Sequence, residues 1–157
     1  MIYGGAGYRL MLLLHILSVL VGFGPWMLNG VLPARAAKLS DGESRVVNLA
    51  NFTVSRASQF GMYAALIFGM GTLGLAKKHT IDFSDAWVSV SLVLWIAIIG
   101  VLHGLVLPAQ RQLGAGEGDR AKLTQRQSLG VSIINLLVIV VVVLMIFEPG
   151  GPKLPYS

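Results

Sequence analysis

Histidine and methionine are the side chains of this 157-residue sequence whose placement could bind a metal. His15 lies in a long uncharged stretch, and Met11 precedes it by four residues, so the two share a face if the stretch is helical. Met70 and Met145 lie in two other uncharged stretches, near the charged boundary that follows each. Imidazole and thioether together suit Cu(I), because soft sulfur favours the reduced ion. The set Met11, His15, Met70 and Met145 is therefore a candidate copper site.

Haem b is the other cofactor that a histidine in an apolar stretch could bind, because haem iron takes imidazole as an axial ligand. Two axial ligands of one iron must lie about 4 Å apart. His15 begins one uncharged stretch and His103 ends another that runs in the same direction, so their depths differ by roughly 18 Å. One haem is therefore not expected to bridge them. His15 with His79, or one histidine with a methionine or water, stays open.

Five polar residues are predicted to share one level of the membrane. Counted at about 1.5 Å per residue, all lie within roughly 5 to 14 Å of one charged boundary; they are Asn29, Gln59, Tyr63, His103 and Asn135. His103 and Asn135 agree best in depth, and an imidazole–amide hydrogen bond would satisfy both. This layer is either a cofactor pocket or a set of interhelical hydrogen bonds, each worth about 0.6 to 2 kcal/mol. His15, His103 and Asn135 are the cofactor-binding candidates.

Long uncharged stretches must position these residues. Hydrophobic residues make up 55% of the chain and charged residues only 12%, against about 45 to 50% apolar residues in soluble domains. Four stretches are long enough to cross a hydrocarbon core of about 30 Å as helices: 10–34, 57–76, 86–110 and 127–147. The predicted fold is a single all-α domain over residues 1–157, an integral membrane four-helix bundle.

The basic residues predict an orientation rather than a nucleic-acid partner. The net charge is +5, but Lys and Arg lie between apolar runs instead of on one solvated face. Eight of them fall in the first and third connections and four elsewhere, so the positive-inside bias places those connections in the cytoplasm. We expect a multi-pass protein of a bacterial inner membrane, with both termini outside. The basic connections, 35–56 and 111–126, are predicted as loops, with an interfacial turn of helix at 46–54.

Two parts of the chain resemble each other. Residues 28–35 match residues 102–111 with two single-residue insertions, and each segment leads to an acidic turn. We interpret the bundle as built from two similar helical hairpins related by duplication, with chance alignment of apolar segments as the alternative. Pro33 and Pro108 would terminate or kink the helix at equivalent places, so irregular backbone is expected there.

Small residues at four-residue spacing indicate close helix packing. Ala57, Gly61, Ala65 and Gly69 form one row, and Gly100 with Gly104 repeats the spacing. Such rows let helices approach closely in lipid. They fit packing within one chain, a homodimer or a larger membrane complex.

Several chemistries are excluded or disfavoured. The chain has no cysteine, which excludes disulfide frameworks, thiolate zinc sites and iron–sulfur clusters. No Asp, Glu, Lys or Arg lies inside the four predicted spans, which disfavours a membrane-embedded acid–base pair or Schiff-base lysine. The sequence therefore favours a non-enzymatic role.

The opening of the first span resembles known bacterial membrane proteins. Leu14-His15-Ile16-Leu17, followed by Gly22, Gly24, Pro25 and Trp26, resembles the copper-resistance D neighbourhood and an uncharacterised family of four-span proteins. It also resembles the four-helix membrane protoporphyrinogen oxidase, in which a first-span histidine, here His15, accompanies haem. The basic residues that this oxidase carries on a later helix are missing between Asp85 and Arg111.

Three functions follow as expectations. The first is a small inner-membrane accessory, assembly or transport component that handles metal or haem. The alternatives are a b-type haem-binding redox protein and a Cu(I) carrier. The lipid bilayer is the expected environment in each case.

Overall fold

The computed structural model describes residues 4–76 and 81–149, and in them the chain is helical apart from short connections. The only β-pairing there is an isolated bridge between Gly4 and Ala76. The elements follow the order α1 (Ala6–Phe23), η1 (Pro25–Gly30), α2 (Val31–Ala36), α3 (Asp41–Leu75), α4 (Ala86–Val101), η2 (Leu102–Val106), α5 (Leu107–Ala115) and α6 (Arg120–Phe147). The predicted all-helical class is confirmed.

Three helical stretches are long and apolar enough to cross a membrane: Ala6–Ala36, Ala86–Ala115 and Arg120–Phe147. They contain the first, third and fourth predicted spans. The second predicted span, 57–76, falls on the C-terminal half of α3, which is not among these three. Gln59, Tyr63 and several glycines lower the hydropathy of that half.

The predicted loops at 35–56 and 111–126 are wrong, because helices occupy most of both segments. Only residues 37–40 and 116–119 connect the helices there. Ser40 and Glu43 form a capping box that begins α3 well before the apolar stretch, and the Asp119 side chain accepts from the backbone N–H groups of Ala121 and Lys122 at the start of α6. The 35 residues of α3 extend about 52 Å, which exceeds a hydrocarbon core of about 30 Å.

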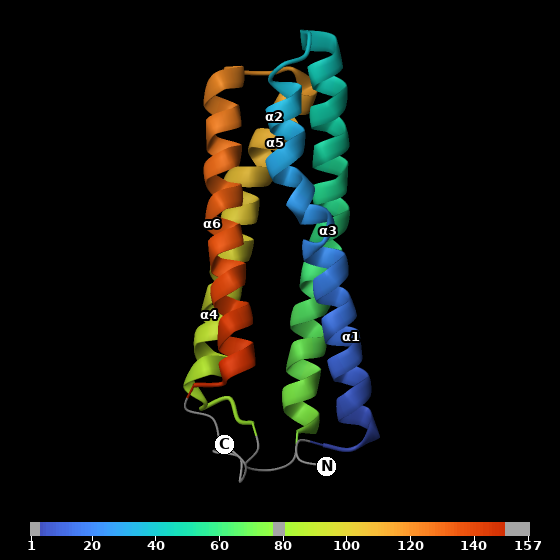
Figure 1. The fold of residues 1–157 in the computed structure, drawn as a ribbon, viewed down its shortest axis with the longest axis vertical. Helices are drawn as coiled ribbons and strands as arrows, with labels where there is room; N and C mark the ends of the chain where they lie inside the picture. Colours follow the sequence, from blue (N-terminus) through green and yellow to red (C-terminus); the bar gives the residue numbers. More distant parts are fainter. Residues whose placement is uncertain (1–3, 77–80, 150–157) are drawn as a thin grey trace.

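The helices form two pairs, α1 with α3 and α4 with α6 (Figure 1). We call the end with connections 37–40 and 116–119 the basic end, and the opposite end, near Gly4 and Glu148, the terminal end. Backbone packing between the pairs is concentrated toward the basic end, where α5 contacts α3 and η1 contacts α6. Toward the terminal end, the pairs lie apart.

Glycine allows α1 and α3 to meet backbone to backbone. A Cβ on Gly61 would lie 2.6 Å from the Gly22 nitrogen, and a Cβ on Gly22 would lie 2.7 Å from the Met62 nitrogen. Gly69 of the same row faces His15. Gly61, Ala65 and Gly69 of this row therefore pack within the chain, whereas Ala57 is exposed and Gly100 and Gly104 have open space beside them.

The irregular backbone expected near the two prolines is present. A 3-10 segment, η1, precedes Pro33, and a π-helical segment, η2, precedes Pro108. Pro108 has no N–H to donate to the carbonyl of Gly104, four residues earlier. The Arg126 guanidinium Nη2 of α6 donates to that carbonyl at 2.7 Å instead.

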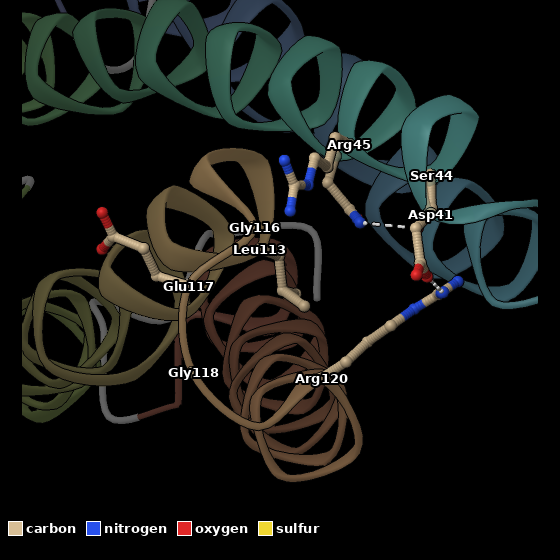
Figure 2. A pocket seen from close by; sticks show the side chains of 9 residues that line it. Asp41, Ser44, Arg45, Leu113, Gly116, Glu117, Gly118 and Arg120 are labelled. Atoms are coloured by element: carbon tan, nitrogen blue, oxygen red, sulfur yellow. Dashed lines mark hydrogen bonds and ion pairs between the residues drawn. The ribbon is translucent and has the colours of Figure 1, made fainter.

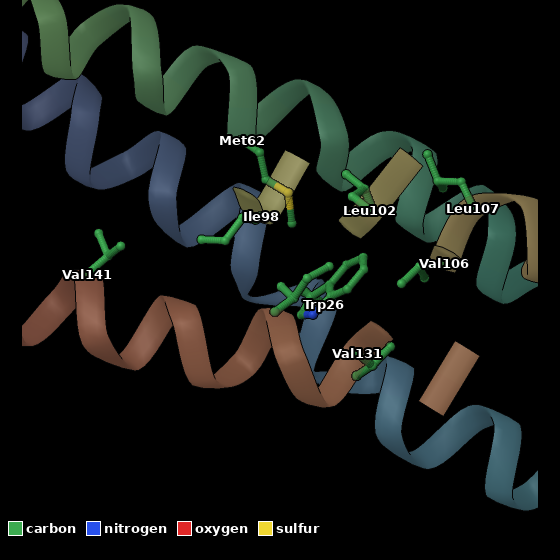
Figure 3. Close-up of a cluster of buried hydrophobic side chains, with 9 residues drawn as sticks. Trp26, Met62, Ile98, Leu102, Val106, Leu107, Val131 and Val141 are labelled. Atoms are coloured by element: carbon green, nitrogen blue, oxygen red, sulfur yellow. The ribbon is translucent and has the colours of Figure 1, made fainter. Parts of the chain in front are cut away.

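The apolar core lies where η1 meets the four long helices (Figure 3). Trp26 fills its centre at 1% exposure, with Met62, Ile98 and Leu102 around it. Val106, Leu107, Val131, Ile134 and Val141 complete the cluster. This core separates a groove at the terminal end from a polar interior toward the basic end.

Candidate functional site

His15 is held in one orientation between α1 and α3. Its Nδ1 lies 2.7 Å from the carbonyl oxygen of Ala65. A carbonyl oxygen only accepts, so Nδ1 carries the proton and Nε2 of the neutral ring carries the lone pair. A Cβ on Gly69 would lie 3.1 Å from ring atoms of His15, so glycine provides the space for the imidazole. A backbone carbonyl that fixes one ring nitrogen is the usual support for a histidine that ligates metal through the other.

His15 lines a groove between the two helix pairs. The groove encloses about 220 Å³ and is walled by α1, α3, α4 and α6. Its lining is mostly apolar, with Phe23, Phe83 and several leucines and valines. On the α4 wall, Trp87, Ser91 and Trp95 follow one another at four-residue spacing, and their Nε1, Oγ and Nε1 atoms are buried without a hydrogen-bond partner in the described part of the chain. The α4 wall therefore presents mainly the apolar parts of these side chains to the groove.

The predicted copper ligands do not lie at one level. Met70 and Met145 line the groove with His15, whereas Met11 packs against Gly71, where a Cβ would lie 3.0 Å from its sulfur. His15 contacts α3 between Ala65 and Gly69, about 4 to 5 Å further from the terminal end than Met70, and Met145 lies two residues before the end of α6. In the described residues, no group of three or more His, Cys, Asp or Glu side chains could hold a metal ion.

His103 and Asn135 do not form the predicted pair. His103 Nε2 lies 2.7 Å from the Tyr63 hydroxyl and 3.3 Å from Gln59 Nε2, and the Tyr63 and His103 rings stack with an interplanar angle of 6°. Gln59 Nε2 also donates to the Tyr63 hydroxyl at 2.6 Å, and Arg56 donates to Gln59 Oε1 at 2.9 Å. Asn135 lies on an exposed face of α6. The two residues were paired because their predicted depths in the membrane agree. Their side chains lie on helix faces that do not point toward each other, so they make no hydrogen bond.

His15 and His103 cannot share one iron. His15 contacts Ala65 and Gly69, while His103 contacts Gln59 and Tyr63. The centres of these contacts are about 9 Å apart along α3, less than the 18 Å expected from sequence but far more than the 4 Å that two axial ligands require. His79 lies outside the described residues, so its pairing with His15 stays a prediction.

Asn29 belongs to a different polar group, buried toward the basic end. Ser55 donates to Asn29 Oδ1 at 3.0 Å, and Gln110 Nε2 donates to the same oxygen at 2.6 Å. We define the polar core as the buried residues Asn29, Asn51, Ser55, Ser58, Gln110 and Gln127, each at most 2% exposed. Of the five residues predicted to share a layer, only Gln59, Tyr63 and His103 come together.

The polar core contains more hydrogen-bonding atoms than it satisfies. Seven of its buried side-chain atoms have no partner among the described residues: Asn29 Nδ2, both amide atoms of Asn51, Ser58 Oγ, Gln110 Oε1 and both amide atoms of Gln127. Without any hydrogen-bond partner, each atom would lower the free energy of unfolding by about 1 to 3 kcal/mol. Together these costs match the entire stability of a typical domain, about 5 to 15 kcal/mol.

A second pocket opens at the basic end (Figure 2). It encloses about 190 Å³ between the start of α3 and the turn from α5 to α6. Arg120 donates to Asp41 at 3.1 Å across it, and its other guanidinium nitrogen donates to the Ala36 carbonyl. Gly116 has φ 71°, and a Cβ there would collide with the Arg45 guanidinium. Ser44 and Asn48 of α3 line the inner side of this pocket.

The sequence singled out His15 as a candidate, and that remains a prediction, but the polar core was missed. Asn48, Asn51 and Ser55 lie in a segment that was interpreted as a loop. A signal was present in their spacing, because polar residues recur at alternating intervals of four and three from Ser44 to Ser58.

No family model, curated protein or solved structure matches the chain. Its function must therefore be argued from its own residues.

Proposed function

We propose that this protein is a small integral membrane component that handles haem b without being an enzyme, in an accessory, assembly or transport role. The orientation of His15 is the observation that carries the proposal. Its Nδ1 is bound to the Ala65 carbonyl, and its Nε2 has no hydrogen-bond partner among the described residues. An imidazole held in this way on the wall of an apolar groove suits axial ligation of haem iron.

The lining of the groove suits haem b, with His15 as the residue that would hold the iron. Apolar and aromatic side chains line it, among them Trp87 and Trp95 on the facing wall. No second histidine among the described residues lies at the level of His15. Among the described residues, His15 is therefore the histidine that would hold haem, which when bound would supply iron chemistry at the groove.

Binding requires the helix pairs to separate further. The groove measures about 220 Å³, whereas pockets for drug-sized ligands range over about 300 to 1,000 Å³. Because backbone packing between the pairs is concentrated toward the basic end, the terminal ends can move apart without breaking the apolar core. The ligand would then hold the two pairs together.

A copper carrier is less well supported. Cu(I) needs its soft ligands within one coordination sphere, but His15, Met70 and Met145 lie at successive levels of the groove. Met11 contacts Gly71 instead of lining the groove.

The proposed topology has four membrane spans. Three are the long apolar stretches named above, and α3 is added to them as the second span in chain order. Burial against α1 explains why α3 needs less hydropathy than its neighbours, since Gly61, Met62 and Ala65 face the protein. The basic end carries most of the Lys and Arg, which supports its placement in the cytoplasm of a bacterial cell with both termini outside. The helix breaks at η1 and η2 support two duplicated hairpins. The exposed Gly100 and Gly104 offer a surface for a homodimer or larger complex.

Titration of ferric haem into the purified protein tests the function. We expect a Soret band that saturates near one haem per chain. His15→Ala should weaken haem affinity by about tenfold or more, since the axial ligand is lost.

Three variants serve as matched controls. His103→Ala should bind haem like the parent, because His103 Nε2 already contacts Tyr63 and Gln59. Met70→Leu and Met145→Leu should also leave the Soret band unchanged. Equal binding by His15→Ala would refute the proposal, and loss of binding only in the methionine variants would favour a thioether-dependent site.

A further inference from the structure

A chain of hydrogen-bonded side chains joins Arg56 and Tyr63 of α3 to His103 of η2. Arg56 Nη1 donates to Gln59 Oε1 at 2.9 Å, and Gln59 Nε2 lies 2.6 Å from the Tyr63 hydroxyl. The hydroxyl in turn lies 2.7 Å from His103 Nε2, and the two rings are nearly parallel, with an interplanar angle of 6°. The donors in this chain determine which atom holds each hydrogen.

The Arg56 guanidinium fixes the direction of the chain. A guanidinium only donates, so the Gln59 atom that faces it is the amide oxygen, and the amide nitrogen faces Tyr63. That nitrogen also only donates, and it lies 3.3 Å from His103 Nε2, so Nε2 carries the lone pair of the neutral ring. The Tyr63 oxygen accepts from Gln59. The phenol hydrogen of Tyr63 is therefore directed at His103 Nε2.

A phenol that donates to an unprotonated imidazole is arranged for proton-coupled oxidation. When a phenol loses an electron it becomes a strong acid, and a base within hydrogen-bond distance takes up the proton. The 2.7 Å between the Tyr63 hydroxyl and His103 Nε2 is within that distance. Loss of one electron would leave a neutral phenoxyl radical on Tyr63 and an imidazolium at His103.

Trp95 of α4 connects Tyr63 to the groove at His15. The centroids of the Tyr63 and Trp95 rings are 6.3 Å apart, and Trp95 lines the groove, whereas Tyr63 does not. Trp95 Nε1 has no hydrogen-bond partner in the described part of the chain, so no base there would take the proton of an oxidised indole. Tyr63 has such a base in His103. An electron vacancy that enters Trp95 from the groove would therefore pass to Tyr63 and stay there.

We infer that Tyr63 and His103 form a redox-active pair that donates one electron to the groove. The acceptor is a strong one-electron oxidant in the groove, which is reduced by one electron that passes through Trp95. As the electron leaves, the O–H bond of Tyr63 breaks and its proton forms an N–H bond at His103 Nε2. Return of one electron from a one-electron reductant, together with that proton, restores Tyr63. The pair goes beyond haem binding, because the oxidant need not be haem.

A light-driven oxidant attached beside the groove tests the pair in the full-length protein without haem. The chain has no cysteine, so Met145→Cys provides a single attachment site, on a residue that lines the groove and is 39% exposed. A ruthenium–bipyridyl complex bound there becomes a strong one-electron oxidant when it is illuminated with a sacrificial electron acceptor. Since haem is absent, the outcome is independent of the haem titration.

We expect the electron paramagnetic resonance spectrum of a neutral tyrosyl radical, with slower formation in heavy water because a proton moves with the electron. Tyr63→Phe, which removes only the hydroxyl, should abolish the signal. Tyr8→Phe is the matched control, because Tyr8 also lines the groove, and it should retain the signal. A radical that persists in Tyr63→Phe, or one that disappears in Tyr8→Phe, would overturn the inference.

His103→Gln distinguishes a proton acceptor from a structural contact. The oxygen of the new amide can still accept the hydrogen bond of Tyr63, but an amide does not take up the proton. Radical formation should therefore slow by about a hundredfold, the lower end of what a positioned base contributes. A rate equal to that of the parent would mean that His103 only positions Tyr63, and the pair would be refuted.

Trp95→Leu tests the connection to the groove. Leucine is apolar but has no aromatic ring from which an electron can be removed. The Tyr63 radical should form more slowly when the oxidant is attached at position 145, whereas a soluble ruthenium complex should oxidise Tyr63 equally well with or without Trp95. An unchanged rate with the attached complex would contradict electron transfer from Tyr63 to the groove through Trp95.

Discussion

Pro108 and Arg126 are coupled through one carbonyl group. Because Pro108 cannot donate, the Gly104 carbonyl accepts from Arg126. Arg126→Gln should therefore destabilise the protein by about 1 kcal/mol, the usual net value of one hydrogen bond. In a Pro108→Ala background a backbone N–H becomes available, so the same substitution should cost less. A double-mutant cycle of thermal unfolding measures this coupling, and additive effects would contradict it.

Glu43 makes the start of α3 sensitive to acid. Hydrogen bonds from the Ser40 side chain and backbone lower the pKa of Glu43 from its ordinary value of 4.5. A lowered pKa in the folded state contributes stability above the ordinary value, and this contribution is lost as pH falls through the folded pKa. Unfolding temperatures should therefore fall more on acidification in the parent protein than in Glu43→Ala.

Glu117→Ala is the control for that comparison, because Glu117 is also exposed at the basic end and its carboxylate makes no hydrogen bond or ion pair in the described part of the chain. It should retain the parent's acid response. An identical response in all three proteins would mean that the capping box contributes nothing.

At the scale of single residues, the sequence was most informative where the residue type alone made a position unusual. An imidazole in an apolar stretch is costly, so His15 stood out, and the structure gives it a partner at Ala65. The pairing of His103 with Asn135 failed because depth is counted along a helix, whereas contact also depends on rotation about its axis. Gln59 and Tyr63 were placed in the same layer, but their contact with His103 depends on packing between α3 and η2.

At the scale of the helices, the close crossing of α1 and α3 depends on Gly61. A methyl group there would lie 2.6 Å from the Gly22 backbone nitrogen, and backbone cannot rotate away as a side chain can. Gly61→Ala should destabilise the protein by about 1 to 3 kcal/mol through overpacking.

Gly74→Ala isolates the effect of that contact. Gly74 lies in the same helix, and a Cβ there meets nothing within 4 Å. Since alanine is the better helix former, this variant should be neutral or more stable by up to about 1 kcal/mol. Equal unfolding temperatures for the two variants would mean that α1 and α3 do not meet at Gly61.

Helix type was predictable, but helix length was not. Uncharged stretches located the apolar parts of α1, α4 and α6, because lipid-length runs of apolar residues have few alternatives. The extension of α3 to Asp41 depends on the capping box and on burial of Ser44, Asn48 and Asn51. A helix whose buried face is polar has the low hydropathy of a loop, so hydropathy alone does not distinguish the two.

At the scale of the whole molecule, the bundle divides into two halves of different chemistry. The terminal half contains an apolar groove lined by His15, whose Nδ1 is held by the Ala65 carbonyl, and the basic half contains buried uncharged polar groups. The apolar core around Trp26 separates the halves. This division suits a protein that takes up a hydrophobic ligand from the terminal side while the basic half holds the pairs together.

Absorption spectroscopy with metal analysis of protein purified from its native membrane tests the haem proposal most directly. The account predicts a Soret band, iron near one equivalent per chain, and loss of both in His15→Ala but not in His103→Ala. A colourless, iron-free protein from haem-replete cells, or a band that persists in His15→Ala, would contradict it.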